Sequence, residues 1–237
     1  NARTYWADTF KGTLPVLNIP TKGARPAVKT YRGAQIQFDL DRELLQDMKS
    51  TCAREGATMF MLVQAALKAL LFRYSGQTDL IIGTPVAGRM QGELADQIGV
   101  YINTLALRST FDSNASFADL IQLIKANTTE AFGHQQWPFD RLVGDLELKR
   151  DLSRSPLFDV LFVLQNLESA VAQKIEMPEL SIEPIGFEST QAKLDLTFTC
   201  SEQGEDFPCS INYNTDLFDG EFIEGMAEHF VSLLQVA

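Results

Sequence analysis

Residues 59–72 are apolar on nearly every side of a helix, and this feature constrains the fold most strongly. Thr58 can cap the start of this helix, and Gly76 can end it. A helix without a polar face has to be buried. The segment is too short to span a bilayer, and Gln64 and Lys68 make it too polar. We therefore expect it inside a soluble core, packed through Phe60, Leu62, Val63, Ala66, Leu67, Leu70 and Leu71.

Strand and helix patterns are intermixed around this segment. Apolar alternation and apolar runs predict strands at residues 35–40, 79–85, 100–108, 157–164, 194–200 and 208–213. Capping residues predict helices from Asp41 to Gly56, from Ser116 to about Phe132 and from Asp219 onward, with a short one after Pro138. The first six residues are typical of the end of a helix, and residues 11–33 and 166–178 are predicted to be connections. Residues 157–164 are apolar throughout, which favours a central strand. The fold class is thus predicted as α/β, a mixed β-sheet packed with helices in an α/β sandwich.

Charge and composition exclude several classes of partner. The chain has 20 Lys and Arg residues and 31 Asp and Glu residues, so its net charge is −11. The basic residues are scattered, whereas nucleic-acid binding needs clustered ones to displace counterions. We therefore expect neither a nucleic acid nor a membrane as partner. The sequence has no signal peptide, which favours the cytoplasm. It also begins without an initiator Met, which favours a fragment of a longer protein.

The cysteines and histidines give no self-contained catalytic centre. Three cysteines lack metal-ligand spacing, so no metal is predicted. Cys200 and Cys209 could face each other across a hairpin, but free thiols are the better prediction for a cytosolic protein. His229 lies on the last predicted helix, where a structural role is expected. His134 could be a general base by residue type, but a packing role beside Trp137 is the simpler interpretation. Nucleophile-elbow, phosphate-loop and dinucleotide motifs are missing from the sequence.

Four segments in a fixed order carry a resemblance to a known family. They are IGTPVAGR (residues 82–89), IGVYINTLALR (98–108), HQQWPFDRLV (134–143) and RDLSRSPLF (150–158). Together they resemble the C-terminal core motifs of condensation domains from nonribosomal peptide synthetases, and the resemblance covers nearly the whole chain. The family's fold consists of two lobes similar to chloramphenicol acetyltransferase. Its HHxxxDG motif, carried by the N-terminal lobe, does not occur in this sequence. The resemblance therefore implies that residues 1–237 are the C-terminal lobe alone.

The resemblance also implies a reaction and its partners. Condensation domains join a donor thioester to the α-amine of an acceptor, and both substrates arrive on 4'-phosphopantetheine arms of peptidyl carrier proteins. This lobe would supply one wall of the tunnel, bind no cofactor itself, and be inactive alone. Its expected partners are the missing N-terminal lobe, the donor and acceptor carrier proteins and a neighbouring adenylation domain. The alternatives are an epimerisation or heterocyclisation relative, or a non-catalytic docking platform.

No catalytic residue is predicted in this chain, but five residues are candidates for structural or tunnel roles. Arg89 follows a strand at a glycine turn, and it is either a surface charge or the partner of the Asp of HHxxxDG. Asn103 and Thr104 interrupt an apolar strand and need polar partners. His134 is included for its loop position. Asn166 either faces the reaction channel or simply ends a strand. Residues 90–97 resemble a loop that closes the tunnel floor. The charges of RDLSRSPLF are expected to form a solvated loop.

Overall fold

The predicted mixture of strands and helices is present in the computed structural model, which describes residues 1–94, 96–166 and 189–236. The helices are α1 (Ala2–Thr9), α2 (Arg42–Glu55), α3 (Met59–Ser75), α4 (Phe117–Gly133), α5 (Phe139–Asp145) and α6 (Gly220–Gln235), with a short 3-10 turn at Gly92–Leu94. The strands are β1 (Gly33–Leu40), β2 (Asp79–Val86), β3 (Asn103–Thr110), β4 (Val160–Asn166), β5 (Leu196–Glu202) and β6 (Phe207–Asn214). The described residues thus contain the six strands and six α-helices that the sequence predicts.

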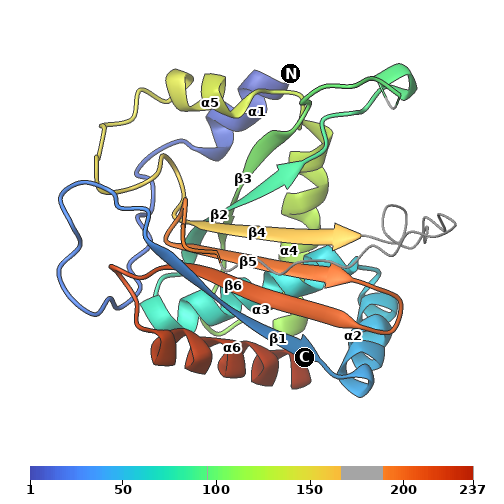
Figure 1. Ribbon diagram of the computed structural model, residues 1–237. Helices are drawn as coiled ribbons and strands as arrows, with labels where there is room; N and C mark the ends of the chain where they lie inside the picture. Colours follow the sequence, from blue (N-terminus) through green and yellow to red (C-terminus); the bar gives the residue numbers. More distant parts are fainter. Residues whose placement is uncertain (95, 167–188, 237) are drawn as a thin grey trace, which may run out of the picture.

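The strands form one mixed sheet in the order β1-β6-β5-β4-β2-β3 (Figure 1). β4 lies between two parallel neighbours, β5 and β2, which confirms the central position predicted from its apolar run. The other neighbouring strands are antiparallel. β4 pairs with β2 through one residue pair, Gly83 with Leu161, whereas it pairs with β5 along its whole length. The sheet therefore has a seam between β2 and β4.

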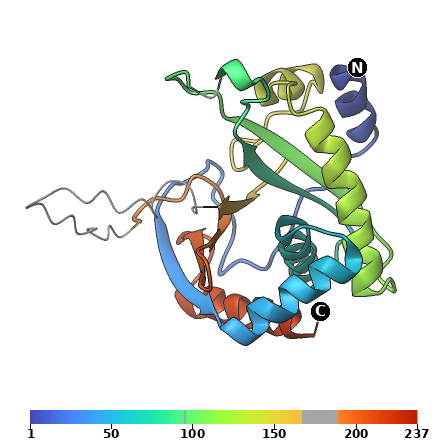
Figure 2. The same ribbon diagram turned by 90° about the vertical axis from the view of Figure 1, so that its right-hand side faces the viewer.

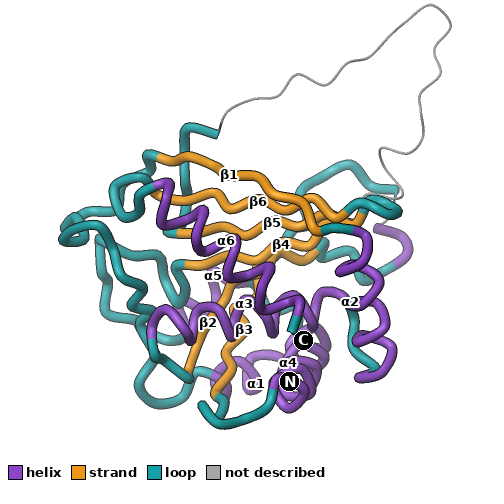
Figure 3. The backbone as a smooth tube through the Cα atoms, turned by 90° about the horizontal axis from the view of Figure 1, so that it is seen from below, coloured by secondary structure: helices purple, strands orange, loops and turns teal. Residues whose placement is uncertain are grey.

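The helices α2, α3 and α6 lie together on one side of the sheet (Figures 2 and 3). The alternation of side chains along the strands explains which side they cover. On β5 and β6 the apolar residues Phe198, Cys200, Cys209 and Ile211 are buried in the main core. The residues between them are less buried and more polar, as Thr197 illustrates. The face opposite the main helices is thus a half-polar surface of the sheet.

The helix α3 is buried as its composition predicts. The Oγ1 of Thr58 accepts a hydrogen bond from the backbone N–H of Met61, and Gly76 ends the helix in the left-handed conformation with φ 69°. Gln64 and Lys68 are buried with it. The Oγ1 of Thr128 on α4 donates to the side-chain carbonyl of Gln64 at 3.0 Å. The ammonium group of Lys68 donates to the carbonyl of Leu107 at 2.9 Å. The two polar residues that argued against a membrane span are therefore bonded inside the core.

Two predicted strands begin three residues later than their apolar patterns suggest, and the strand predicted at 194–200 begins at Leu196. The strand predicted at 100–108 is β3, which begins only at Asn103, because its partner β2 ends at Val86 opposite that residue. The residues before it are an exposed loop despite their apolar character. The strand predicted at 157–164 begins at Val160, because Leu157 has φ 67° and turns the chain. The predicted loop at 166–178 lies outside the described residues beyond Asn166.

Cys200 and Cys209 face each other across the hairpin of β5 and β6, as the sequence allowed. Their sulfur atoms lie 2.9 Å apart, and both are free thiols. In the described part of the chain, no single helix is long and apolar enough to cross a membrane. Only α2 and α3 taken together, with a bend of 103° between them, reach that length and composition.

Candidate functional site

A groove of about 540 Å³ lies on the face of the sheet opposite the main helices. Its floor crosses several strands, since Leu161 on β4 pairs with Thr197 on β5 and Thr197 pairs with Asn212 on β6. Thr104 on β3 and Phe139 at the start of α5 also line it. Lys193 is the only titratable side chain among the described residues of its lining. The groove can therefore bind and orient a chain with both apolar and polar groups, but it offers no evident acid–base pair.

Phe158 forms one wall of the groove because of an unusual turn. Leu157 has φ 67°, and the backbone N–H of Phe158 donates to the carbonyl of Pro156 at 2.8 Å. This bond closes a three-residue γ-turn of the rare, strained kind. The ring of Phe158 then lies on Gly83, where an added Cβ would be 2.2 Å from the ring. Glycine at position 83 is thus what lets the aromatic ring lie against the seam of the sheet.

Two largely buried ion pairs hold the groove's edge. Arg154 donates to the carboxylate of Asp159 at 2.5 Å, and the N–H of Ser155 donates to the same carboxylate at 3.1 Å. Arg25 binds the carboxylate of Asp195 through both terminal nitrogens. Burial raises the pKa of Asp195, and the Arg25 hydrogen bonds oppose that shift.

These pairs correct the expectation that the charges of RDLSRSPLF form a solvated loop. Arg150 and Asp151 are exposed as expected, but Arg154 is mostly buried because the carboxylate of Asp159 is held beneath it. Its guanidinium also donates to the carbonyl of Leu17 at 3.0 Å. This loop is therefore fixed to the connecting segment that precedes β1.

Asn103 has the polar partners that its position requires. Its side-chain amide donates to the carbonyls of Gln135 and Trp137, both at 2.8 Å, and its side-chain oxygen accepts from the N–H of Phe139 at 3.0 Å. One side chain thus ties the start of β3 to the turn between α4 and α5. Because Phe139 lines the groove, Asn103 positions that wall without lining it.

The other strand candidates differ in their relation to the groove. Thr104 is half-buried and lines it. His134 is the residue that ends α4, and its ring centre lies 4.4 Å from that of Tyr5. Its backbone carbonyl accepts from the indole N–H of Trp6 at 3.0 Å. His134 therefore packs α1 against α4, away from the groove. Asn166 ends β4 opposite Glu202, but its side chain lies outside the described residues.

Arg89 holds the loop that follows β2. Its guanidinium donates to the carbonyls of Leu94 and Gly99, the latter at 3.1 Å, and it stacks over the ring of Tyr101 with 4.3 Å to the ring centre. Gly88 has φ 65°, and an added Cβ would lie 1.9 Å from the carbonyl oxygen of Tyr101. The sharp turn expected at Gly88 is present, and it directs Arg89 into its own loop.

The groove's strongest features have little direct sign in the sequence. The alternating polar residues of β5 and β6, Thr197 and Asn212 among them, mark an uncovered face, and this pattern was available in the sequence. The ion pair of Arg25 with Asp195 joins residues 170 positions apart and has no local signature. Among the described residues, no three His, Cys, Asp or Glu side chains are grouped to hold a metal.

Comparisons with known proteins identify the family to which this fold belongs. The model of the condensation domain family matches residues 1–237. Tyrocidine synthase 3 of Brevibacillus parabrevis is 41% identical over 231 residues, and bacitracin synthase 3 of Bacillus licheniformis is 43% identical over 233 residues. Each match covers 98% of this chain but only 4% of the relative. The chain is therefore similar to a short part of very long synthetases.

Solved structures agree with this result. The X-domain from teicoplanin biosynthesis superposes with a TM-score of 0.88 at 28% identity, covering 99% of this chain and 53% of that one. A four-domain nonribosomal peptide synthetase superposes with a TM-score of 0.89 at 24% identity, covering 99% of this chain and 19% of that one, and shows the fold alone. The predicted chloramphenicol acetyltransferase-like α/β fold is confirmed. The chain belongs to the condensation domain family of the nonribosomal peptide synthetases.

Proposed function

We propose that this chain is the C-terminal lobe of a condensation domain and that its open sheet face lines the channel in which the amide bond forms. The observation that carries the proposal is the groove itself, which lies on the face of the sheet that α2, α3 and α6 leave open among the described residues. Several condensation-type structures support the division into lobes, because the chain covers about half of each: 53%, 56% and 49%.

The loop before β3 supports a partner lobe at this face. Ile98 is 104% exposed, Val100 is 91% exposed and Ile102 is 67% exposed. Three apolar side chains at such exposure within five residues are typical of a surface that another protein unit covers. We propose that the N-terminal lobe covers them and that Arg89, which braces this loop, stabilises the junction. The pairing of Arg89 with the Asp of HHxxxDG remains a prediction.

In the proposed reaction the lobe contributes binding and orientation. The nitrogen of the acceptor amine attacks the thioester carbonyl of the donor, the C–S bond breaks, and the donor arm leaves as a thiol. Thr104, Thr197 and Asn212 would contact the tethered chains, and Phe158 and Phe139 would exclude water. Fixing two reactants in one geometry can lower a barrier by about 7–11 kcal/mol, so a lobe without an acid or base still affects the rate. Proton transfer would belong to the HHxxxDG motif.

The test uses carrier proteins loaded with a donor and an acceptor. We expect amide formation from the two-lobed domain of the parent synthetase and none above the buffer control from residues 1–237 alone. Turnover by the isolated chain would contradict the division of labour. A product with an inverted donor centre or a heterocycle would instead identify an epimerisation or heterocyclisation relative.

The docking-platform alternative has one observation in its favour, which is the 28% identity to the X-domain of teicoplanin biosynthesis. That domain has also been solved in complex with another protein, OxyB. The identities of 41% and 43% to peptide synthetases favour the catalytic proposal. The parent sequence upstream of Asn1 distinguishes the two. An intact HHxxxDG motif supports catalysis, and a degraded one supports the platform.

A further inference from the structure

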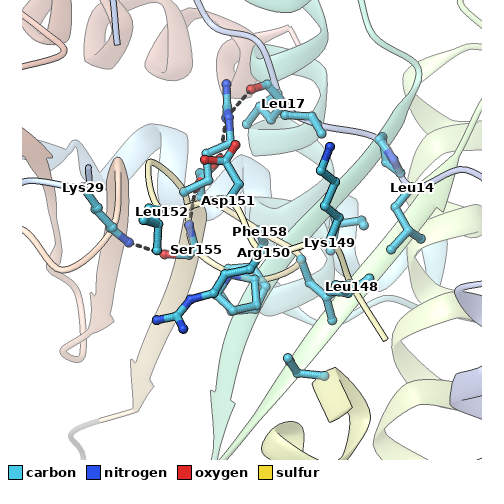
Figure 4. A pocket seen from close by; sticks show the side chains of 18 of the residues that line it. Leu14, Leu17, Lys29, Leu148, Lys149, Arg150, Asp151, Leu152, Ser155 and Phe158 are labelled. Atoms are coloured by element: carbon cyan, nitrogen blue, oxygen red, sulfur yellow. Dashed lines mark hydrogen bonds and ion pairs between the residues drawn. The ribbon is translucent and has the colours of Figure 1, made fainter. Parts of the chain in front are cut away.

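A second cavity, of about 780 Å³, lies at the seam of the sheet where β2 and β4 separate (Figure 4). The connecting segment before β1, the first residues of β2 and the loop between α5 and β4 enclose it. Ser155, Pro156 and Phe158 line both this cavity and the groove, so a single short segment separates the two. The volume is within the range of about 300–1,000 Å³ that small-molecule sites occupy.

The charge of this cavity is opposite to that of the chain. Its described lining contains Lys29, Lys149, Arg150 and Arg154 against Asp79, Asp151 and Asp159. Two of these carboxylates are already bound, Asp79 by Arg108 at 2.7 Å and Asp159 by Arg154 at 2.5 Å. Three cations therefore remain against one carboxylate, in a chain whose net charge is −11.

The remaining cations have unused hydrogen-bonding capacity. The ammonium group of Lys29 is half-buried and donates to the hydroxyl of Ser155, although a lysine can donate three hydrogen bonds. Its burial lowers the pKa of Lys29, which means that its charge is incompletely solvated. Lys149 and Arg150 are exposed and have no hydrogen-bond or ion-pair partner within the described residues. An anion at this position would supply the missing acceptors.

Charged and apolar side chains both line the cavity. In Figure 4, Lys29 and Ser155 lie on one side together with Leu152, and Leu14 and Leu148 lie on the other together with Lys149. Further apolar residues complete the lining, namely Val16, Val28, Val143 and Leu157. A ligand with a negative head and an apolar chain would match Lys29 and Ser155 at one end and Leu14 and Leu148 at the other.

We propose that this cavity is a binding site for an amphipathic organic anion. Its carboxylate or phosphate head contacts Lys29, Ser155 and Arg150, and its hydrocarbon chain extends toward Leu14 and Leu148. The proposal does not rest on the condensation reaction, although Ser155, Pro156 and Phe158 line both the cavity and the groove.

The probe is dodecanoate, titrated below its critical micelle concentration and followed by calorimetry. We expect saturable binding at one site, and we expect dodecyltrimethylammonium, with the same chain and a positive head, to bind much more weakly. Affinity should rise from octanoate to dodecanoate by up to about fourfold per methylene, equivalent to about 0.8 kcal/mol. Vesicles of anionic phospholipid distinguish the source of the ligand. Cosedimentation with them would assign the head-group chemistry to a membrane lipid, and its absence would assign it to a free acid.

Substitutions locate the site. K29Q and R150Q should each weaken dodecanoate binding by about tenfold or more, since a hydrogen bond to a charged group is lost. The control is K49Q, which removes the same charge from an exposed position on α2. Melting temperatures show that each variant is folded, and the exposed R150Q remains informative should K29Q fail to fold. The proposal is overturned by absent binding, by equal affinity for the cationic detergent, or by unchanged affinity in R150Q.

Discussion

Lys68 should make the stability of this lobe depend on pH in the alkaline range. The side chain lies in the middle of α3 and is fully buried. Its ammonium nitrogen donates to the carbonyl of Leu107 at 2.9 Å and to the hydroxyl of Ser109 at 2.6 Å. Burial lowers the pKa of Lys68 from 10.5 to about 7, and the more distant Asp79 only partly opposes this shift.

The sign of the effect follows from which state binds the proton. Between pH 7 and the ordinary value of 10.5, unfolded Lys68 is protonated and folded Lys68 is mostly neutral. Unfolding therefore takes up a proton, and the free energy of unfolding rises with pH. The slope approaches about 1.4 kcal/mol per pH unit. Below pH 7 both states are protonated, so the slope vanishes and the cost of burying the charge is constant.

Replacing Lys68 with methionine isolates the contribution of Lys68 to the pH dependence of the free energy of unfolding. K68M keeps most of the length of the side chain and removes the titrating group. It also removes the donor to the carbonyl of Leu107, whereas the hydroxyl of Ser109 still accepts from the side-chain amide of Asn127 at 3.1 Å. The stability of K68M relative to the parent at any one pH is therefore a balance of two effects. The free energy of unfolding of K68M minus that of the parent is expected to fall by about 1.4 kcal/mol for each pH unit, because only the parent gains stability as the pH rises.

The assay is urea unfolding of both proteins at several values between about pH 7.5 and 9.5, where the slope should be largest. K49M, at an exposed position on α2, controls for the loss of a lysine. All other titrating groups are shared and cancel in the difference. A difference between K68M and the parent that is constant with pH would show that Lys68 stays protonated in the core and would refute the reasoning.

Three further predictions concern the groove and the junction. G83A should lower stability by about 1–3 kcal/mol through overpacking, because its Cβ would lie 2.2 Å from the ring of Phe158. The same change should cost less in an F158A background, and equal costs in circular dichroism melts would disprove the contact. I98D should reduce the self-association of the isolated chain in sedimentation across a concentration series, since Ile98 is fully exposed; unchanged association would assign it to another surface. In the two-lobed domain, R89A should lower both the melting temperature and the condensation rate, whereas the surface change R42A should alter neither; parent-like behaviour of R89A would remove its role at the junction.

Most of the fold could be predicted because local patterns determine it. Thr58 and Gly76 fix the ends of α3 through backbone bonds that any such helix needs. The apolar run of β4 has no polar side to expose, so a central place in the sheet follows. These signals are confined to neighbouring residues, and no tertiary contact overrides them.

The features that could not be predicted depend on contacts between segments that are distant in the sequence, or on a surface for a partner. Val100 and Ile102 alternate as a strand would, but they are exposed, and apolar alternation alone does not distinguish a buried strand from a surface for a partner. The γ-turn at Leu157 depends on Gly83, which is distant in sequence and gives space to Phe158. The edge of the groove likewise depends on Arg25, whose partner comes from the far end of the chain.

The most direct test of the central claim is a pair of threonine substitutions on β5 in the two-lobed domain. Thr197 lines the groove, whereas Thr199 has the same orientation one pleat further along and lies outside the groove's lining. Filling the groove with T197F should reduce amide formation from loaded carrier proteins by about a hundredfold, the order expected for misplaced reactants, while T199F should retain activity near that of the parent. Both variants should melt near the parent temperature. Equal activity of folded T197F and the parent would contradict the claim that the open sheet face lines the reaction channel.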